Sequence, residues 1–140
     1  MERILLVTAE PWARNMLSLL RQCPGELEVN HAIDGAQGLY YMSQSIYAGN
    51  PYHLLILTSP LPKLSPESTI AAIRAIEKGL NRPPYPCLLC SSYEAPQGLL
   101  ATYPQTLHLQ VPDAPQAASM VTAASLQVLS RLKRFQEVVL

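Results

Sequence analysis

Charge is scarce in this sequence. Only 14% of the 140 residues are charged, and 10 basic residues balance 10 acidic ones to a formal net charge of +0. A neutral chain has no overall field that would draw it toward DNA, RNA or an anionic membrane. We therefore expect no direct nucleic-acid binding, and recognition of any partner by local shape.

Long apolar runs are also absent. Stretches such as residues 4–7 and 54–57 are far shorter than the ~20 apolar residues that a membrane-spanning helix needs. The chain opens with Met1-Glu2-Arg3 and passes directly into a strand-like segment, with no apolar signal segment. The sequence predicts no membrane association and a cytoplasmic location.

Cysteine is sparse and odd in number. Cys23, Cys87 and Cys90 are too few for a disulfide framework. Cys87 and Cys90 fall on a predicted strand, where their thiols point to opposite faces, so we interpret them as packing residues and not as a redox pair.

Apolar segments alternate with helical patterns along the whole chain. With 49% hydrophobic residues, one sizeable core can form. The predicted strands are residues 3–8, 27–33, 54–57, 87–90 and 107–111. Helices are predicted after Pro11, after Asp34, after Ser65, at residues 95–103 and at residues 115–138. The inward positions of the second and third helices are Leu39, Met42, Ile46, Ile70, Ile73, Ile76 and Leu80. This order predicts an α/β fold, a parallel sheet with helices on both faces.

Three stretches together resemble one family. They are Arg3-Ile-Leu-Leu-Val, Ala32-Ile-Asp-Gly-Ala-Gln-Gly-Leu39, and Pro51-Tyr-His-Leu-Leu-Ile-Leu followed by Leu61-Pro62. In order and spacing they resemble the receiver domain of response regulators, over residues 3 to about 131. The resemblance implies a flavodoxin-like (βα)5 fold with strand order 2-1-3-4-5. It also implies a single domain over residues 1–140, with residues 131–140 as a helical extension.

The resemblance implies a phosphorylation pocket that has lost its chemistry. Working receivers hold Mg²⁺ with an acidic pair, which Thr8 and Ala9 replace here. The phosphoryl-accepting aspartate matches Thr58, and the lysine that pairs with phosphate matches Val111, so only the hydroxyl at Ser91 is kept. The chain is thus identified as a degenerate member, or pseudo-receiver, that cannot accept a phosphoryl group.

Metal and cofactor sites are not predicted. Glu10 is the sole carboxylate expected near the pocket, and one carboxylate rarely makes a Mg²⁺ site. His31, His53 and His108 lie in separate strands or strand edges, without a second ligand at metal-binding spacing. By the resemblance, His108 occupies the aromatic switch position near the signalling surface.

The last predicted helix is unusually long. Residues 115–138 would span about 36 Å, whereas the last helix of a receiver is nearer half that length. Its apolar face carries Val128, Leu132, Phe135 and Val139, which the sheet would leave uncovered. We expect an interaction surface there, unless the helix breaks near Ser130.

The sequence favours a binding module over an enzyme. The first hypothesis is a phosphorylation-independent adaptor in signal transduction that binds a protein partner, or a second copy as a homodimer, through its last strand, with His108, and its C-terminal helix. A second is a flavodoxin-like protein that binds a small ligand or cofactor with the hydroxyls of residues 58–59 and 91–92, although no glycine-rich phosphate loop or acid–base pair is visible. A third is a scaffold subunit of a larger assembly.

Overall fold

Five parallel strands form one sheet. The structure is a computed structural model that describes residues 2–9, 13–23, 27–59, 61–93, 102, 105–112 and 116–139, the last eight by their backbone alone. The strands are β1 (Glu2–Val7), β2 (Leu27–Ala32), β3 (Leu54–Thr58), β4 (Cys87–Ser91) and β5 (Thr106–Gln110). Their order in the sheet is β2-β1-β3-β4-β5, which confirms the predicted order.

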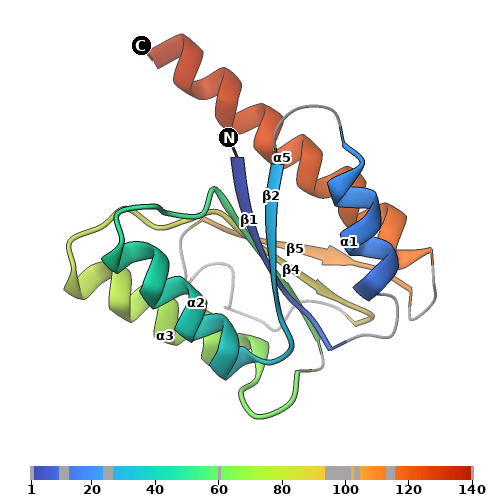
Figure 1. Ribbon diagram of the computed structural model, residues 1–140, viewed down its shortest axis with the longest axis horizontal. Coiled ribbons are helices and arrows are strands. Elements are labelled where there is room, and N and C mark those ends of the chain that lie inside the picture. The colour runs from blue at the N-terminus through green and yellow to red at the C-terminus, as the bar shows by residue number, and fades with distance from the viewer. Residues whose placement is uncertain are drawn as a thin grey trace.

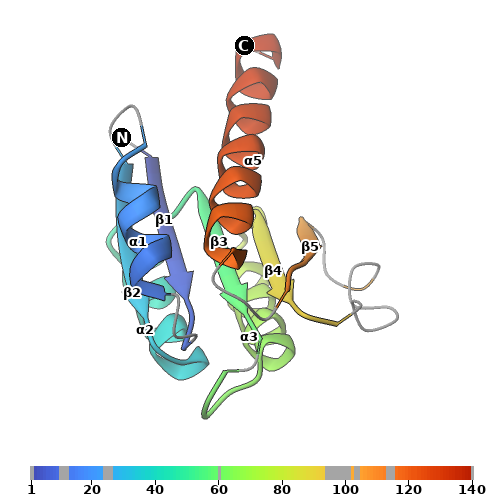
Figure 2. The ribbon, with the colours of Figure 1, turned by 90° about the vertical axis from the view of Figure 1, so that its right-hand side faces the viewer.

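Helices cover both faces of this sheet. Helices α1 (Ala13–Arg21) and α5 (Ala117–Val139) lie on one face, and α2 (Gly35–Tyr47) and α3 (Pro66–Gly79) lie on the other (Figures 1 and 2). The helix predicted at residues 95–103 lies outside the described residues, apart from the isolated Thr102.

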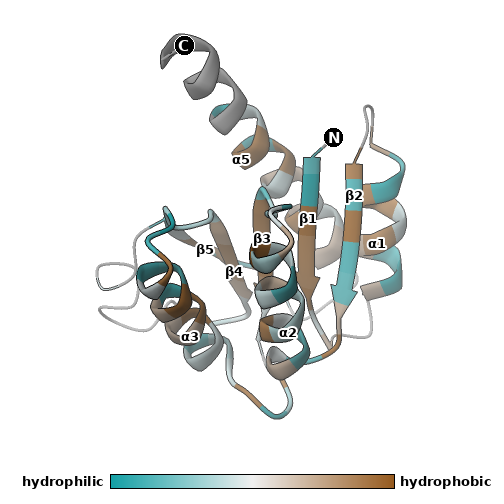
Figure 3. Ribbon diagram, turned by 60° about the vertical axis from the view of Figure 1, so that its left-hand side comes forward, coloured by the Kyte–Doolittle hydropathy of each residue, from teal (hydrophilic) through white to brown (hydrophobic). Residues whose placement is uncertain are grey.

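The core is divided by the sheet into two apolar clusters. Along β1, Ile4 and Leu6 pack toward α1 and α5, while Leu5 and Val7 pack toward α2 and α3. A strand buried on both faces needs no polar alternation, and β3 is accordingly mostly apolar (Figure 3), with Thr58 as its last residue. Cys90 belongs to the first cluster and Cys87 to the second. The prediction that their thiols point to opposite faces is confirmed.

Two predicted helix starts are confirmed by their caps. The Oδ1 of Asp34 accepts a hydrogen bond from the backbone N–H of Gln37 at 2.7 Å, and the Oγ of Ser65 accepts one from the N–H of Ser68 at 3.1 Å. Helix α2 also lies very close to the sheet, since a Cβ at Gly38 would come within 2.9 Å of Val7 Cγ2.

The ends of several elements differ from the prediction. Strand β2 ends at Ala32, and Ile33 is 55% exposed. Strand β5 ends at Gln110, so Val111 follows the strand and is not part of it. Leu80, predicted to point inward, is 55% exposed because it is the C-cap residue beyond the end of α3.

Helix α5 is a single helix, as predicted, and the alternative of a break near Ser130 is wrong. Its 23 residues correspond to about 35 Å, and its last turns extend past the end of the sheet where β1 begins (Figures 1 and 2). Leu129, which the sequence pattern missed, is 6% exposed, and Val128 packs partly buried against the same core. Among the described residues, no helix is long and apolar enough to cross a membrane.

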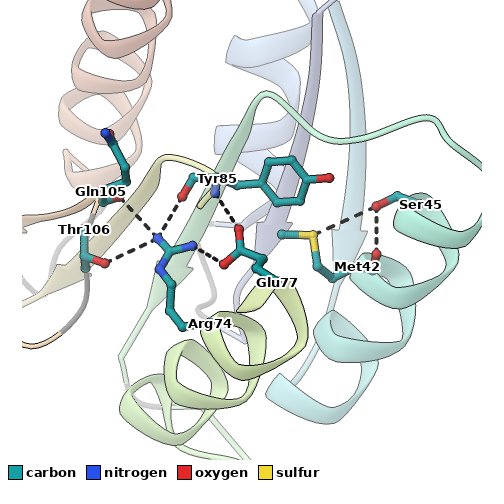
Figure 4. A network of polar contacts seen from close by, with 7 residues as sticks. All are labelled: Met42, Ser45, Arg74, Glu77, Tyr85, Gln105 and Thr106. Atoms are coloured by element: carbon teal, nitrogen blue, oxygen red, sulfur yellow. Dashed lines mark hydrogen bonds and ion pairs between the residues drawn. The ribbon is translucent and has the colours of Figure 1, made fainter. Parts of the chain in front are cut away.

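A buried ion pair joins α3 to the start of β4 and β5. Arg74 Nη1 donates to Glu77 Oε1 at 2.6 Å, and the two side chains are 8% and 2% exposed. Arg74 Nη2 donates to the carbonyl oxygen of Tyr85 at 2.7 Å, and Glu77 Oε2 accepts from the Tyr85 N–H at 2.5 Å. Longer contacts reach Gln105 and Thr106 (Figure 4). The pair thus fixes the segment before β4 against α3.

Removing one charge of this pair should strongly destabilise the fold. We expect Glu77→Gln to lower the free energy of unfolding by about 3–5 kcal/mol, because Arg74 would keep a buried charge without its counterion. Lys78→Ala, at the exposed next residue, should change it by less than about 0.5 kcal/mol. Urea denaturation measures both, and equal effects of the two substitutions would contradict this role of the pair.

Candidate functional site

Four of the predicted pocket residues gather at the carboxyl end of the sheet. Thr58 and Ser91 are the last residues of β3 and β4, and Thr8 and Val111 directly follow β1 and β5. Backbone hydrogen bonding between neighbouring strands continues one residue beyond the ends of β1 and β5. Thr8 N–H donates to Ala32 O at 3.0 Å, and Val111 N–H donates to Ser91 O at 2.8 Å. The backbone therefore holds these residues in fixed positions.

Thr8 and Thr58 bond to each other at the centre of this end. The hydroxyl of Thr58 donates to Thr8 Oγ1 at 2.7 Å, and the two residues are 1% and 0% exposed. The carbonyl oxygen of Thr8 is also used, since it lies 3.0 Å from His31 Nε2. A carbonyl only accepts, so Nε2 of His31 carries the proton. Two neutral, buried hydroxyls thus occupy the positions where the resemblance implies carboxylates.

The carboxylate present among the described residues at this end is already engaged. Asp34, 4% exposed, caps α2 with Oδ1 and faces Lys63 Nζ with Oδ2 at 3.7 Å. Asp34 is thus a carboxylate at this end that the sequence pattern misses, since the sequence predicts Glu10 alone there. Ala9 is exposed, and Glu10 lies outside the described residues.

The side-chain oxygens of Thr8 and Thr58 are poor ligands for Mg²⁺, the cation that receivers hold. Mg²⁺ requires carboxylate oxygens and open coordination positions, whereas Thr8 and Thr58 offer neutral hydroxyls bonded to each other. Among the residues that the structure describes, no three His, Cys, Asp or Glu side chains come together as a metal site.

Ser91 is also bonded within the protein. Its hydroxyl donates to the carbonyl oxygen of Tyr93 at 2.8 Å and lies 2.7 Å from His108 Nε2. A hydroxyl has one proton, so His108 Nε2–H is the donor in the second bond. His108 therefore ties β5 to the end of β4. Burial lowers the pKa of His108 from its ordinary value, which favours the neutral ring.

Tyr93 is a residue at this end that sequence reasoning missed. Its hydroxyl lies 3.0 Å from Ser59 Oγ, so it links the segment after β4 to the segment after β3. The ring is 53% exposed. No motif marks Tyr93, and its distance of two residues from Ser91 is the one signal in the sequence.

The structure describes the side chains of two of the five predicted interaction residues. His108 and Val128 are half-buried, and the side chains of Leu132, Phe135 and Val139 lie outside the described residues. The distal turns of α5 extend past the opposite end of the sheet from the Thr8–Thr58 pair (Figure 1). Apolar side chains on the outside of β5 and α5 that sequence reasoning missed are Leu107 (50% exposed), Met120 (40%) and Leu126 (37%).

The buried thiols have no reactive form near neutral pH. Burial raises the pKa of Cys87 to about 12 and also raises the pKa of Cys90. Since the thiolate is the reactive species, both residues serve packing.

The fold is similar to that of several solved response regulators. The Mn²⁺-bound form of response regulator Rcp1 superposes with a TM-score of 0.68 at 18% identity, covering 88% of this chain and 91% of that one. Chemotaxis protein CheY4 of Vibrio cholerae gives 0.67 at 22% identity, covering 94% and 98%. The response regulator domain of Thermotoga maritima CheB gives 0.65 at 16% identity, covering 94% and 95%.

The chain has the fold of response-regulator receiver domains. The receiver fold extends over almost the full length of both chains in each of these comparisons. No protein-family model matches the sequence, and no curated protein matches it either. The shared receiver architecture thus comes with low sequence identity.

The Thr8–Thr58 bond can be measured by a double-mutant cycle. Thr58→Val and Thr8→Val should each lower the free energy of unfolding by about 1–3 kcal/mol, because each removes one partner of a buried hydrogen bond. The double variant should lose less stability than the two single variants together, by about 1 kcal/mol. Strictly additive losses in urea denaturation would show that the two hydroxyls do not interact.

The pKa of His108 should be lower than that of an unperturbed histidine. Its folded pKa is lowered by burial, so the unfolded chain takes up a proton first as the pH falls. The contribution of His108 to stability is therefore complete above about pH 6.5 and is lost as the pH falls below that value. NMR titration of the His108 ring measures this directly, with His108→Gln to assign the signal. A midpoint at or above 6.5 would contradict the burial argument.

Proposed function

We propose that this chain is a pseudo-receiver, a regulatory module of signal transduction that acts by protein–protein interaction without being phosphorylated, and that it is not an enzyme. The hydrogen bond between the buried hydroxyls of Thr58 and Thr8 is the observation that carries this proposal.

Phosphoryl transfer to Thr58 would require three things that its surroundings oppose. A nucleophile must reach the phosphodonor, yet Thr58 is 1% exposed. It must lose its proton to a base, yet its hydroxyl donates to Thr8, another hydroxyl. Developing phosphate charge must be neutralised, yet Val111 stands at the position that the resemblance gives to lysine. A stable, unphosphorylated state follows.

The solved structures with this fold support a role in signalling. They include response regulator Rcp1, the chemotaxis protein CheY4 and the response regulator domain of CheB. Rcp1 was solved with Mn²⁺, whereas neutral hydroxyls stand at the corresponding end of this chain. We infer that this chain uses the receiver fold to present a protein-binding surface.

The surface that we assign to the partner is the outer side of β5 and α5. The β5–α5 surface comprises Leu107, His108, Met120, Leu126 and Val128, with Leu132, Phe135 and Val139 as predicted further members. Leu107, Met120 and Leu126 are exposed apolar side chains, which suit a protein interface better than a nucleic-acid interface, and His108 and Val128 are half-buried beside them in the sequence. The occupant we assign is a protein partner, and a second copy of the chain is the alternative.

Two other hypotheses have less support. A flavodoxin-like ligand site would need free hydroxyls at the carboxyl end of the sheet, but Thr58 and Ser91 bond to Thr8, Tyr93 and His108. The scaffold hypothesis is supported by the length of α5. A scaffold subunit would use the same β5–α5 surface as an adaptor and would differ from it in the number of partners that it binds.

Phosphorylation can be tested by intact mass. The protein incubated with acetyl phosphate and Mg²⁺ should gain no phosphoryl group, while an active response regulator in the same tube should gain one and so prove the reagent. A phosphoryl adduct on Thr58 would overturn the proposal.

The interaction surface can be tested with paired leucine variants. Leu107→Glu should abolish capture of a partner from the native host, because a charge would be buried in the interface. Leu80→Glu is the matched control, since Leu80 is 55% exposed, as against 50% for Leu107, but lies at the end of α3. Loss of the same partner with Leu80→Glu, and not with Leu107→Glu, would place the interface elsewhere.

A further inference from the structure

The outer face of α2 has an unusual composition for a surface helix. Tyr40 and Tyr47 are 61% and 97% exposed, and Gly35–Tyr47 contains no Asp, Glu, Lys or Arg. The outer face of a surface helix normally carries charge. We propose that this face binds the same face of a second copy, which goes beyond the proposed function.

The exposed residues form one narrow face. Tyr40 and Tyr47 are joined by Ala36, Ser43 and Gln44, all exposed, and by the half-buried Gln37. At about 100° per residue, all of these lie within about 60° of Tyr40 around the helix axis. The opposite side carries Met42 and Ile46, which are buried in the core. The α2 face is therefore distinct from the residues that hold the helix to the sheet.

The α2 face is complementary to itself. In an antiparallel pair of α2 helices with the two-fold axis at Tyr40, two residues face each other when their numbers add up to 80. Tyr40 then meets its own copy, Gln37 meets Ser43, and Ala36 meets Gln44. Tyr47 meets Ile33, the 55% exposed residue just before the helix. Five of the six residues of the face thus find a partner within it, and Tyr47 finds one in the adjoining Ile33, so the two copies match as a symmetric dimer requires.

The absence of charge favours a second copy over a charged partner. An identical α2 face brings no like charge against itself, and a charged helix would find no counterion there. The nearest charged groups at the start of the helix, Asp34 and Lys63, lie 3.7 Å apart and compensate each other. Nothing in this face therefore opposes self-association.

The tyrosines are suited to anchor such an interface. Tyrosine buries a large area with few rotatable bonds and is enriched at interface hot spots. The ring of Tyr40 also stands edge-on to that of Tyr41, with centroids 6.1 Å apart and an interplanar angle of 69°. Tyr41 packs partly buried against the core, so it restrains Tyr40 at the centre of the face.

This dimer would leave the proposed partner surface open. Helix α2 lies on the opposite face of the sheet from α1 and α5 (Figure 3). Two copies joined through α2 would each keep the β5–α5 surface exposed. The pair would then present two partner sites at once, which raises avidity without any new contact.

Charge substitution at the two-fold axis tests the inference. Sedimentation equilibrium of the full chain should show a concentration-dependent dimer. Tyr40→Glu and Tyr40→Lys should each weaken it by at least about tenfold, because each places a like charge against its own copy. A mixture of Y40E and Y40K should form dimers again, since residue 40 of one copy faces residue 40 of the other. Circular dichroism checks that both variants fold.

Two results would overturn the inference. One is a wild-type chain that stays monomeric at every concentration. The other is a dimer that survives both Tyr40 variants but dissociates with Leu126→Glu on α5, which would place the contact on the β5–α5 surface. Neither result depends on phosphorylation, so failure here is distinct from failure of the proposed function.

Discussion

The hydrogen bond between Thr8 and Thr58 follows from a constraint that governs the whole fold. Helices cover both faces of the sheet, so its polar side chains can lie only where strands end or at the outer strands. At the carboxyl end, β1 and β3 stop side by side and bring these two residues together. Any group placed there must be neutralised by a ligand or satisfied by its neighbour. In this chain the neighbour satisfies it.

The same constraint places the buried ion pair away from the candidate site. The buried ion pair Arg74–Glu77 holds the segment that leads into β4, at the amino end of that strand. At the carboxyl end, Ser91 is held by neutral groups, between Tyr93 and His108, and the charge of Asp34 is compensated by Lys63. Thr8 and Thr58, at the centre of this end, are neutral and bonded to each other. The function that we propose therefore relies on the outer surfaces of the helices and of β5, and not on the carboxyl end of the sheet.

The sequence predicted the fold well because strands that are buried on both faces are uninterrupted apolar runs, which can be recognised in the sequence. Apolar runs such as β3 and caps such as Asp34 and Ser65 are local signals, and each was found where predicted. The positions of Thr8 and Thr58 were also predictable, since parallel strands align their ends. Which hydroxyl bonds to which depends on distances that no local pattern contains. For the same reason no local pattern marks Arg74 and Glu77 as a buried ion pair.

A Mg²⁺ and beryllofluoride titration followed by amide NMR tests the central claim most directly. Beryllofluoride mimics a bound phosphoryl group only where a metal and a free acceptor oxygen are both available. If the hydroxyls of Thr8 and Thr58 are fully engaged with their neighbours, their amide signals and those around Ser91 will not shift at millimolar Mg²⁺. Saturable shifts centred on Thr58 would contradict the account.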